Sequence, residues 1–356
     1  SNVAHVTQTG RHNWLAALSQ LSSSAEGTNT ITFIATGDFN GVDPNTQSGP
    51  GDLAVLARSS GAHASQLVQG TDLSGGALNL MNVTITGSFN QYGLEQYDVD
   101  NSVGAVVTGL SNSFGSYQLG RHNQITTGGI AGDSNDMGIR QVGEDNVAAA
   151  VLQWSSSDNR IGIGQNGDAN DGDISLKGNG SLIGLSQDGR GHVADVTVTG
   201  NDNVLFGIQS NAGLTASLGN TLTVTITGSF NNALSGGLPQ AFTGAALSVA
   251  SSGPLIPGAL LVAPDATALL GPHSGNLLLI PGTLLQWGEA NSIDIEVGAL
   301  SPSDGNLFAV AQKGDRNVLT ASIEGSYNQL AVLQMGDDNI VATSQVGTGN
   351  VIGISQ

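Results

Sequence analysis

The sequence has 356 residues and no cysteine, and aromatic residues make up only 4% of it. Without cysteine the chain has no disulfide, no thiol nucleophile and no thiolate zinc site. A globular core of ordinary construction in a chain of this length would contain more aromatic residues. We therefore expect an architecture of thin stacked layers that does not need bulky core residues.

Charge is also scarce, at 10% of residues, and it is unbalanced, with 9 basic against 28 acidic side chains. This fraction of charged residues is too low for an ordinary disordered chain. The net charge of −19 argues against non-specific nucleic-acid binding and would keep separate subunits soluble. Residues 1 to 20 lack a basic start and a continuous apolar run, so if the protein is secreted, we expect Ser1 to follow a removed signal.

Asparagine and glycine, in contrast, recur with a fixed period. Over residues 306–356, Asn stands at 306, 317, 328, 339 and 350, every eleven residues. A short fixed period is typical of stacked repeats. Residues two, four and six after each Asn share its face of a strand, and a Gly eight residues after it begins a polar corner. Each repeat is therefore a strand followed by a turn.

Glutamine distinguishes an 11-residue coil from a 22-residue coil. From Asn79 to Asn203, the sixth residue after each repeat start is alternately Gln and another residue. In a 22-residue coil, every Gln then lies above another Gln in one sheet, about 4.8 Å away. A continuous row of amides satisfies its own hydrogen bonds when buried. The sequence predicts an all-β fold, a two-sheet parallel β-solenoid (β-helix) of about 22 residues per coil, stacking into a cross-β fibre.

The predicted site is this set of ladder and corner residues, and no catalytic, cofactor-binding or metal-binding residue is expected. The predicted ladder residues are Gln96, Gln118, Gln141, Gln165, Gln187, Gln209, Gln312, Gln334, Gln345, Gln356, Asn90, Asn112, Asn317, Asn328, Asn339 and Asn350. The predicted corner residues are Gly87, Gly120, Gly143, Gly314, Gly325, Gly336 and Gly347.

Two segments interrupt the period. We expect solenoid coils over residues 1–40, 79–231 and 286–356, an irregular insertion over 41–78 that is either a loop excursion or an irregular coil, and a Pro/Leu-rich insertion over 232–285. Prolines at 254, 257, 264, 272 and 281 exclude a membrane-spanning helix of about 20 residues, and we expect no helix in this insertion. An apolar, almost uncharged segment of this kind is expected to cover a solenoid face or a neighbouring subunit.

The runs Asn112-x5-Gln118-x-Gly120-x2-Asn123 and Asn328-x5-Gln334-x-Gly336-x2-Asn339 resemble the curlin repeat of curli fimbrial subunits. The resemblance implies a two-sheet solenoid that is secreted unfolded and polymerises outside the cell into amyloid-like fibres of the biofilm matrix. It also implies cell adhesion, with a secretion pore and a nucleator protein as partners. The chain departs from the family in its length, its two insertions and its lack of Gln on one strand of most coils.

The sequence therefore predicts a structural, extracellular protein that forms a homopolymer by end-to-end stacking, with no nucleic-acid partner and no membrane insertion. The alternatives are a monomeric secreted β-helix adhesin and a carbohydrate-binding or ice-binding protein. An enzyme is not expected, because the histidines lack partners at metal-ligand spacing. Acidic corners, including Asp315 and Asp337, are expected to be solvated. Phe39, Phe89 and Phe230 share a corner motif that predicts local packing or a subunit contact.

Overall fold

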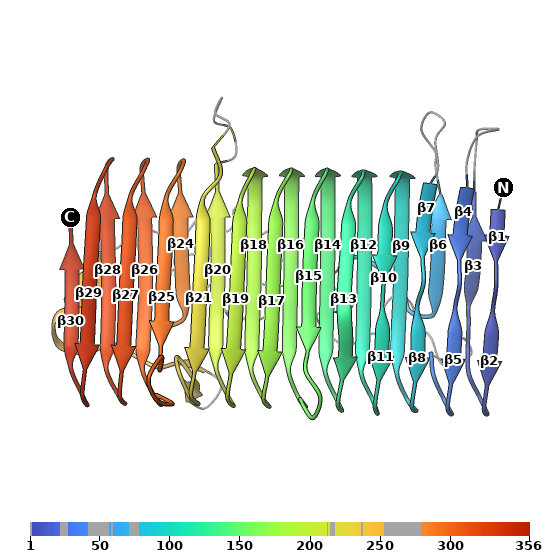
Figure 1. Cartoon of the computed structure of the whole chain (residues 1–356), viewed down its shortest axis with the longest axis horizontal. Helices are drawn as coiled ribbons and strands as arrows, with labels where there is room; N and C mark the ends of the chain where they lie inside the picture. Colours follow the sequence, from blue (N-terminus) through green and yellow to red (C-terminus); the bar gives the residue numbers. More distant parts are fainter. Residues whose placement is uncertain are drawn as a thin grey trace. The chain divides into compact units, whose positions relative to one another are not determined.

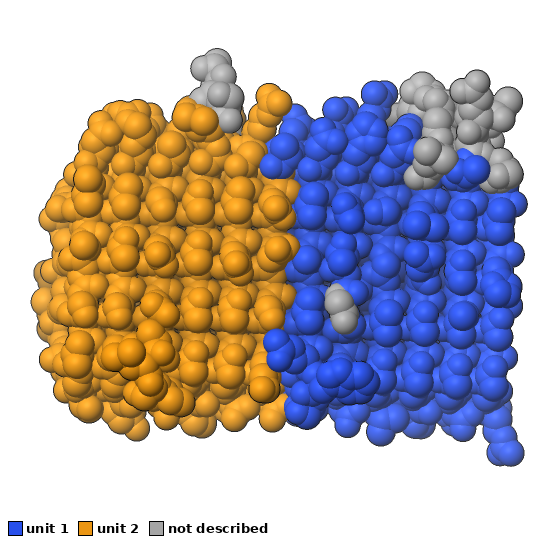
Figure 2. All heavy atoms as spheres, viewed as in Figure 1, with its two compact units in different colours: residues 1–169 blue, residues 170–356 orange. Residues whose placement is uncertain are grey.

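The computed structural model describes residues 2–21, 28–41, 57, 60–70, 78–211, 213, 218–235, 238–252 and 279–356. The chain forms two compact units, Ser1–Ala169 and Asn170–Gln356, which are coloured separately in Figure 2. Predictions that concern residues 42–56, 71–77 and 253–278 lie outside the described residues, so most of both insertions remains a prediction.

Each unit is a parallel β-solenoid with two sheets, here named sheet A and sheet B. Within a sheet all arrows point the same way, and the two sheets run in opposite directions because each corner turns the chain back (Figure 1). One strand of sheet A and the following strand of sheet B make one coil, called a rung below. The predicted two-sheet parallel β-solenoid is confirmed.

In the first unit, sheet A contains β1(Asn2–Ala4), β4(Thr28–Ile31), β7(Leu78–Met81), β10(Ser102–Gly104), β13(Gln124–Ala131) and β15(Val147–Leu152). Four of its rungs continue after a break as β2(Thr7–Thr9), β5(Ile34–Thr36), β8(Thr84–Thr86) and β11(Val106–Thr108). Sheet B contains β3(Ala17–Gln20), β6(Gln66–Gly70), β9(Gln91–Val99), β12(Ser113–Arg121), β14(Asp136–Glu144) and β16(Arg160–Asp168).

In the second unit, sheet A contains β17(Asp171–Lys177), β19(Val193–Thr199), β21(Thr221–Thr227), β25(Ser292–Val297), β27(Val318–Glu324) and β29(Ile340–Val346). Sheet B contains β18(Leu182–Arg190), β20(Val204–Ser210), β24(Thr283–Trp287), β26(Leu307–Lys313), β28(Gln329–Met335) and β30(Val351–Ser355). A two-stranded hairpin, β22(Leu234–Ser235) and β23(Leu238–Pro239), precedes the helix α2(Gly244–Ser252).

Burial follows the period of two that the sequence predicts. Along β17 and β19, buried residues alternate with exposed or half-buried ones, because only one side chain in two points between the sheets. Sheet B of the second unit differs, since every residue of β20 is buried. A second layer therefore covers the outer face of this sheet.

That layer includes the described residues of the second insertion. Its Phe242, Ala246, Ala250 and Leu279 form one apolar cluster with outward residues of sheet B, among them Phe206. The expectation that this segment contains no helix is wrong, because residues 240–253 are free of proline and α2 forms there. The expectation that the insertion covers a solenoid face is confirmed for its described residues.

Both insertions leave a sheet B strand just after its Asn corner. Gly41 and Ser65 donate backbone N–H groups to the carbonyls of Asn90 and Tyr92, at 2.7 and 2.6 Å. Asn232 and Gly282 donate in the same way to Asn306 and Phe308, both at 2.8 Å. The flanking residues of each insertion thus stay hydrogen-bonded to the next rung.

The expected irregular insertion over residues 41–78 contains one regular strand that the sequence pattern did not predict. β6 lies between β3 and β9 in sheet B, with Gln69 in register with Gln20 and Gln96. The pattern missed it because no Asn corner directly precedes the strand. Residues 66–70 therefore belong to the solenoid.

Candidate functional site

A glutamine column runs through sheet B of each unit. In the column, the Nε2 of each Gln donates to the Oε1 of the Gln in the next rung, at 2.8 to 3.1 Å. The bonded series are Gln20, Gln69, Gln96, Gln118, Gln141 and Gln165 in the first unit, and Gln187, Gln209, Gln286, Gln312 and Gln334 in the second. The predicted Gln ladder is therefore present, with Gln20, Gln69 and Gln286 added.

The same amides also hold the two sheets together. Gln118 donates to the backbone carbonyls of Ser102 at 3.1 Å and Asn123 at 2.9 Å, both outside its own strand. Its side chain is fully buried. A buried amide in an apolar interior is stable only when its hydrogen-bonding groups are paired, and the column and the carbonyls together pair them.

Asparagine columns run along the corners. Asn112 donates both its backbone N–H, at 3.0 Å, and its side-chain Nδ2, at 3.2 Å, to the Oδ1 of Asn90. Its Nδ2 also donates to the carbonyl of Gly132 in the next rung, at 2.7 Å. The same side-chain bond to the preceding Asn is made by Asn90, Asn317, Asn328, Asn339 and Asn350, as predicted.

The predicted corner glycines all have positive φ: Gly87 117°, Gly120 115°, Gly143 124°, Gly314 119°, Gly325 100°, Gly336 99° and Gly347 109°. At most of these corners, the close stacking of successive rungs also requires glycine. A Cβ on Gly120 would overlap the carbonyl oxygen of Gly143, and one on Gly314 would overlap that of Gly336. Glycine is therefore needed both for the backbone conformation and for the close approach of successive rungs.

His192 takes an asparagine position without breaking the column. Its backbone N–H donates to the Oδ1 of Asn170 at 3.1 Å, and its Nδ1 accepts the N–H of Asn220 at 3.1 Å. Since Nδ1 is an acceptor, the proton of the neutral ring lies on Nε2, which is 3.2 Å from the carbonyl of Asp188. Burial lowers the pKa of His192 from 6.5 to about 4, so the ring is neutral at pH 7.

Gln345 does not lie in the Gln column, and this part of the predicted ladder is wrong. It belongs to β29 of sheet A, in register with Ile323. It is 2% exposed, and its Nε2 donates to the carbonyls of Gln329 at 2.9 Å and Asn350 at 3.4 Å. Its Oε1 is buried and has no hydrogen-bond partner among the described residues.

The outermost described rung of the second unit satisfies its remaining amides locally. Asn339 and Asn350 donate to the carbonyls of Met335 at 3.3 Å and Val346 at 3.1 Å, within their own corners. In inner rungs, the corresponding donors reach a glycine carbonyl of the next rung. Gln356 follows Gln334 in the strand register, but it is exposed, and its Nε2 donates to the carbonyl of Ile340 at 3.4 Å.

Acidic corner residues also bond across rungs. The Oδ1 of Asp315 accepts the backbone N–H of Glu289 at 3.0 Å, and the Oδ1 of Asp337 accepts that of Asp315 at 2.9 Å. Arg316 forms a two-bond ion pair with Asp338, at 2.7 and 2.9 Å. Within the described parts of the chain, no group of three or more His, Asp or Glu side chains is placed to hold a metal ion.

An aromatic column occupies one corner of the first unit. The ring of Phe39 stacks on His12 at 4.9 Å and on Phe89 at 5.1 Å, and the two Phe planes are 1° from parallel. Ser111 and Ser134 occupy the next two corners, so the column ends at Phe89, which is 56% exposed. Local packing of Phe39 and Phe89, one of the two alternatives predicted for this motif, is confirmed.

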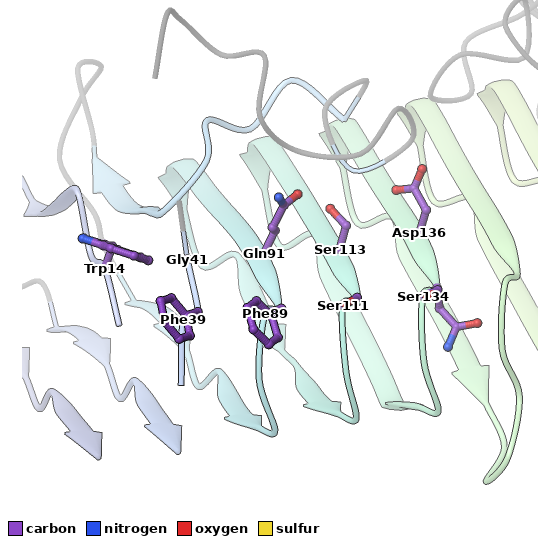
Figure 3. Close-up of a pocket in the computed structure, with 10 residues that line it drawn as sticks. Trp14, Phe39, Gly41, Phe89, Gln91, Ser111, Ser113, Ser134 and Asp136 are labelled. Atoms are coloured by element: carbon purple, nitrogen blue, oxygen red, sulfur yellow. The ribbon is translucent and has the colours of Figure 1, made fainter. Parts of the chain in front are cut away.

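The aromatic column borders a groove of about 480 Å³. Figure 3 shows Gln91, Ser113 and Asp136 side by side along its other border, on three successive strands of sheet B. The groove thus combines aromatic rings with the amide of Gln91, whereas Ser113 and Asp136 are buried and the Oδ1 of Asp136 accepts the backbone N–H of Ala57 at 2.9 Å. Sequence reasoning missed it, because Phe39 and Phe89 become neighbours only when the first insertion leaves the rung.

Comparisons with known proteins give no family assignment. No protein-family model matches the chain, and no curated protein sequence is significantly similar to it. The described helical residues include no segment with the length and hydropathy needed to cross a membrane.

Proposed function

We propose that this chain is a structural subunit of an extracellular, curli-like fibre of a biofilm matrix, and that copies polymerise end to end by stacking their rungs. The observation that carries the proposal is the pair of amide ladders, whose bonds repeat from rung to rung within each unit. A ladder of this kind continues wherever another rung with the same spacing is added. A second copy of the chain supplies such a rung.

The donors of the outermost rung support the same proposal. Asn339 and Asn350 make short-range bonds at positions where inner asparagines reach the next rung. A rung stacked on β29 and β30 would replace these bonds by ladder bonds. The contact is heterologous, so repeated addition gives an open filament instead of a closed ring.

Location and partners follow from the resemblance of the Asn-Gln-Gly spacing to curlin repeats. We propose secretion to the cell surface, a role in adhesion, and a homopolymer assembled with a secretion pore and a nucleator. The function is mechanical persistence, and the proposal assigns the chain no catalytic step, cofactor or nucleic-acid partner.

The test is the behaviour of the purified chain at neutral pH without added cofactor. We expect filaments in electron micrographs and a cross-β diffraction pattern with a spacing of 4.7 to 4.8 Å along the filament. A species that sediments as a monodisperse monomer over a wide concentration range would contradict the proposal.

The groove beside Phe89 favours a second candidate, a monomeric adhesin that binds carbohydrate. The exposed ring of Phe89 offers a face for the C–H groups of a sugar, and the amide of Gln91 borders the same groove. Titration with soluble oligosaccharides tests it. Saturable binding by a monomer, lost in Phe89→Ala and kept in Phe230→Ala, would favour this function over the fibre.

A further inference from the structure

One inward column of sheet A is aliphatic in every described rung except two. In register order it contains Gln8, Ala35, Ile85, Val107, Ile130 and Leu152 in the first unit. In the second unit it contains Leu176, Val198, Ile226, Val297, Ile323 and Gln345. Glutamine thus occurs only in the rung of β1 to β3 and in the rung of β29 and β30.

Gln345 lacks the hydrogen-bonded Gln neighbour that the glutamines of the sheet B column have. Its two amide hydrogens are directed to the carbonyls of Gln329 and Asn350, but its buried Oε1 has no donor among the described residues. The neighbour on one side is Ile323, whose side chain cannot donate a hydrogen bond. A buried acceptor without a partner is unfavourable. The Nε2 of Gln312 bonds the two equivalent carbonyls and also donates to the Gln of the following rung, so the Nε2 of Gln345 is oriented towards a rung that would follow β29 and β30.

Gln8 is the matching residue. It lies in β2, whose described pairing is with β5 alone, and its side chain is exposed. Its register partner Ala35 offers no side-chain hydrogen bond. The other edge of β2 has no strand beside it among the described residues.

We propose that the rung of β29 and β30 in one copy stacks on the rung of β1 to β3 in a second copy, and that Gln345 donates its side-chain N–H to the Oε1 of Gln8 of the second copy, in the same direction as the bonds of the Gln column. This inference rests on the proposed function and names the contact through which the fibre grows. The partner is a second copy of this chain, identified by the two amides that interrupt an otherwise aliphatic column in the described rungs.

The remaining columns continue in the same register. The stacked rung places Gln20 over Gln356, Asn13 over Asn350 and Asn2 over Asn339, each residue over one of its own type. A slip of one residue would turn every inward side chain of the added rung outward. The Gln8–Gln345 pair therefore selects the register and rejects a contact with an inner rung, where the opposing residue is aliphatic.

The absence of cysteine allows a direct test by disulfide cross-linking. Full-length Gln8→Cys and full-length Gln345→Cys are mixed, incubated under filament-forming conditions and oxidised with copper phenanthroline. Registered strands in adjacent rungs are about 4.8 Å apart, within the range that a disulfide spans. The matched control replaces Gln345→Cys by Ser344→Cys, which lies on the outward face of the same strand.

We expect a disulfide between the two different proteins in the mixture with Gln345→Cys, at least tenfold more abundant than with Ser344→Cys. Filaments that form without this cross-link would overturn the inference and leave the proposed function standing. Monomers that give neither filaments nor cross-link would overturn both.

Leucine substitutions test the amide pair itself. Gln8→Leu or Gln345→Leu alone creates a mismatch at the contact, and we expect each to raise the critical concentration for filament growth about tenfold. The double variant restores a Leu-on-Leu contact like those of the inner rungs, and growth should recover. A double variant no better than the single ones would contradict the pairing.

Discussion

Gln209 and Gln286 are 77 residues apart in the chain, yet the Nε2 of Gln209 donates to the Oε1 of Gln286 at 2.9 Å. Gln187 and Gln209 are 22 residues apart and make the same bond at 2.9 Å. The ladder geometry is therefore independent of the length of chain inserted between two rungs. The entropic cost of closing a loop grows only slowly with its length, so a long insertion is compatible with an unbroken ladder.

Breaking the ladder in its middle should destabilise the fold. In Gln118→Leu, the Nε2 of Gln96 loses its acceptor and the Oε1 of Gln141 loses its donor. Each buried group left unpaired costs about 1 to 3 kcal/mol, so we expect a loss of about 2 to 6 kcal/mol in the free energy of unfolding. Urea denaturation followed by circular dichroism measures it.

In the isolated chain, Gln345→Leu should not lower the free energy of unfolding as Gln118→Leu does. This change removes a buried unpaired oxygen and places an aliphatic side chain beside Ile323. We expect the free energy of unfolding of the monomer to stay equal or to rise by about 1 kcal/mol. A loss as large as that in Gln118→Leu would show that Gln345 is already paired within one chain.

Substitutions at two corner glycines allow the cost of backbone strain to be measured separately from the cost of disturbing the stacked rungs. Gly325 and Gly347 have φ of 100° and 109°, but only at Gly325 would a Cβ overlap the carbonyl oxygen of the next rung. We expect Gly347→Ala to cost about 1 to 3 kcal/mol from strain alone. Gly325→Ala should cost more, because the two rungs must also separate.

The same two glycines allow an effect on folding to be distinguished from an effect on filament assembly. In a filament, Gly347 faces the next subunit, so Gly347→Ala should stop elongation at protein concentrations where the monomer remains folded. Filaments of Gly347→Ala that grow at the wild-type rate would argue against stacking at this rung. Light scattering and electron microscopy of the folded variant provide the measurement.

His192 should make the fold sensitive to acid. Its pKa is lowered to about 4 in the folded state from 6.5, so the neutral ring is favoured by folding. As the pH falls below 6.5, the unfolded chain takes up a proton that the folded chain refuses until about pH 4. Between pH 7 and pH 5, this group should cost about 2 kcal/mol of stability.

The matched variant is His192→Asn, which restores the residue type of the column and does not titrate. The carboxyl groups affect both proteins alike, so the comparison isolates the histidine. We expect the variant to lose about 2 kcal/mol less than the wild type between pH 7 and pH 5. Equal pH dependence of the two unfolding free energies would show that His192 is not buried as a neutral ring.

The second insertion should control lateral contacts. Joining Asn232 directly to Gly282 keeps the rung and exposes Phe206, Ile208 and other outward residues of sheet B that the insertion covers. We expect filaments of this variant to bundle side by side while keeping their cross-β diffraction, because exposed apolar faces associate. Filaments with unchanged diameter and bundling would contradict this role.

The ladders could be predicted from the sequence because their residues recur with a strict period. The alternation of Gln with other residues established two sheets, and glycine with asparagine located the corners. The position of Gln345 was not recognised, since the list of ladder glutamines did not follow which sheet each strand joins. β6 was missed because an insertion, and not a corner, precedes it.

Interactions between separate segments could not be predicted from the period. The stack of Phe39 on Phe89 and the groove beside it depend on where the first insertion leaves the rung. The helix α2 and its apolar contacts depend on the tertiary position of a segment that has no repeat. Proline density alone predicted too little regular structure there, because proline is absent from the stretch that forms the helix.

The most direct test of the account is a side-chain-resolution electron cryomicroscopy map of filaments grown from the full chain. It should show the glutamine column of sheet B continuing across the boundary between subunits, with Gln356 of one copy beside Gln20 of the next. Filaments whose subunits meet through their sides, with the column ending at each boundary, would contradict it.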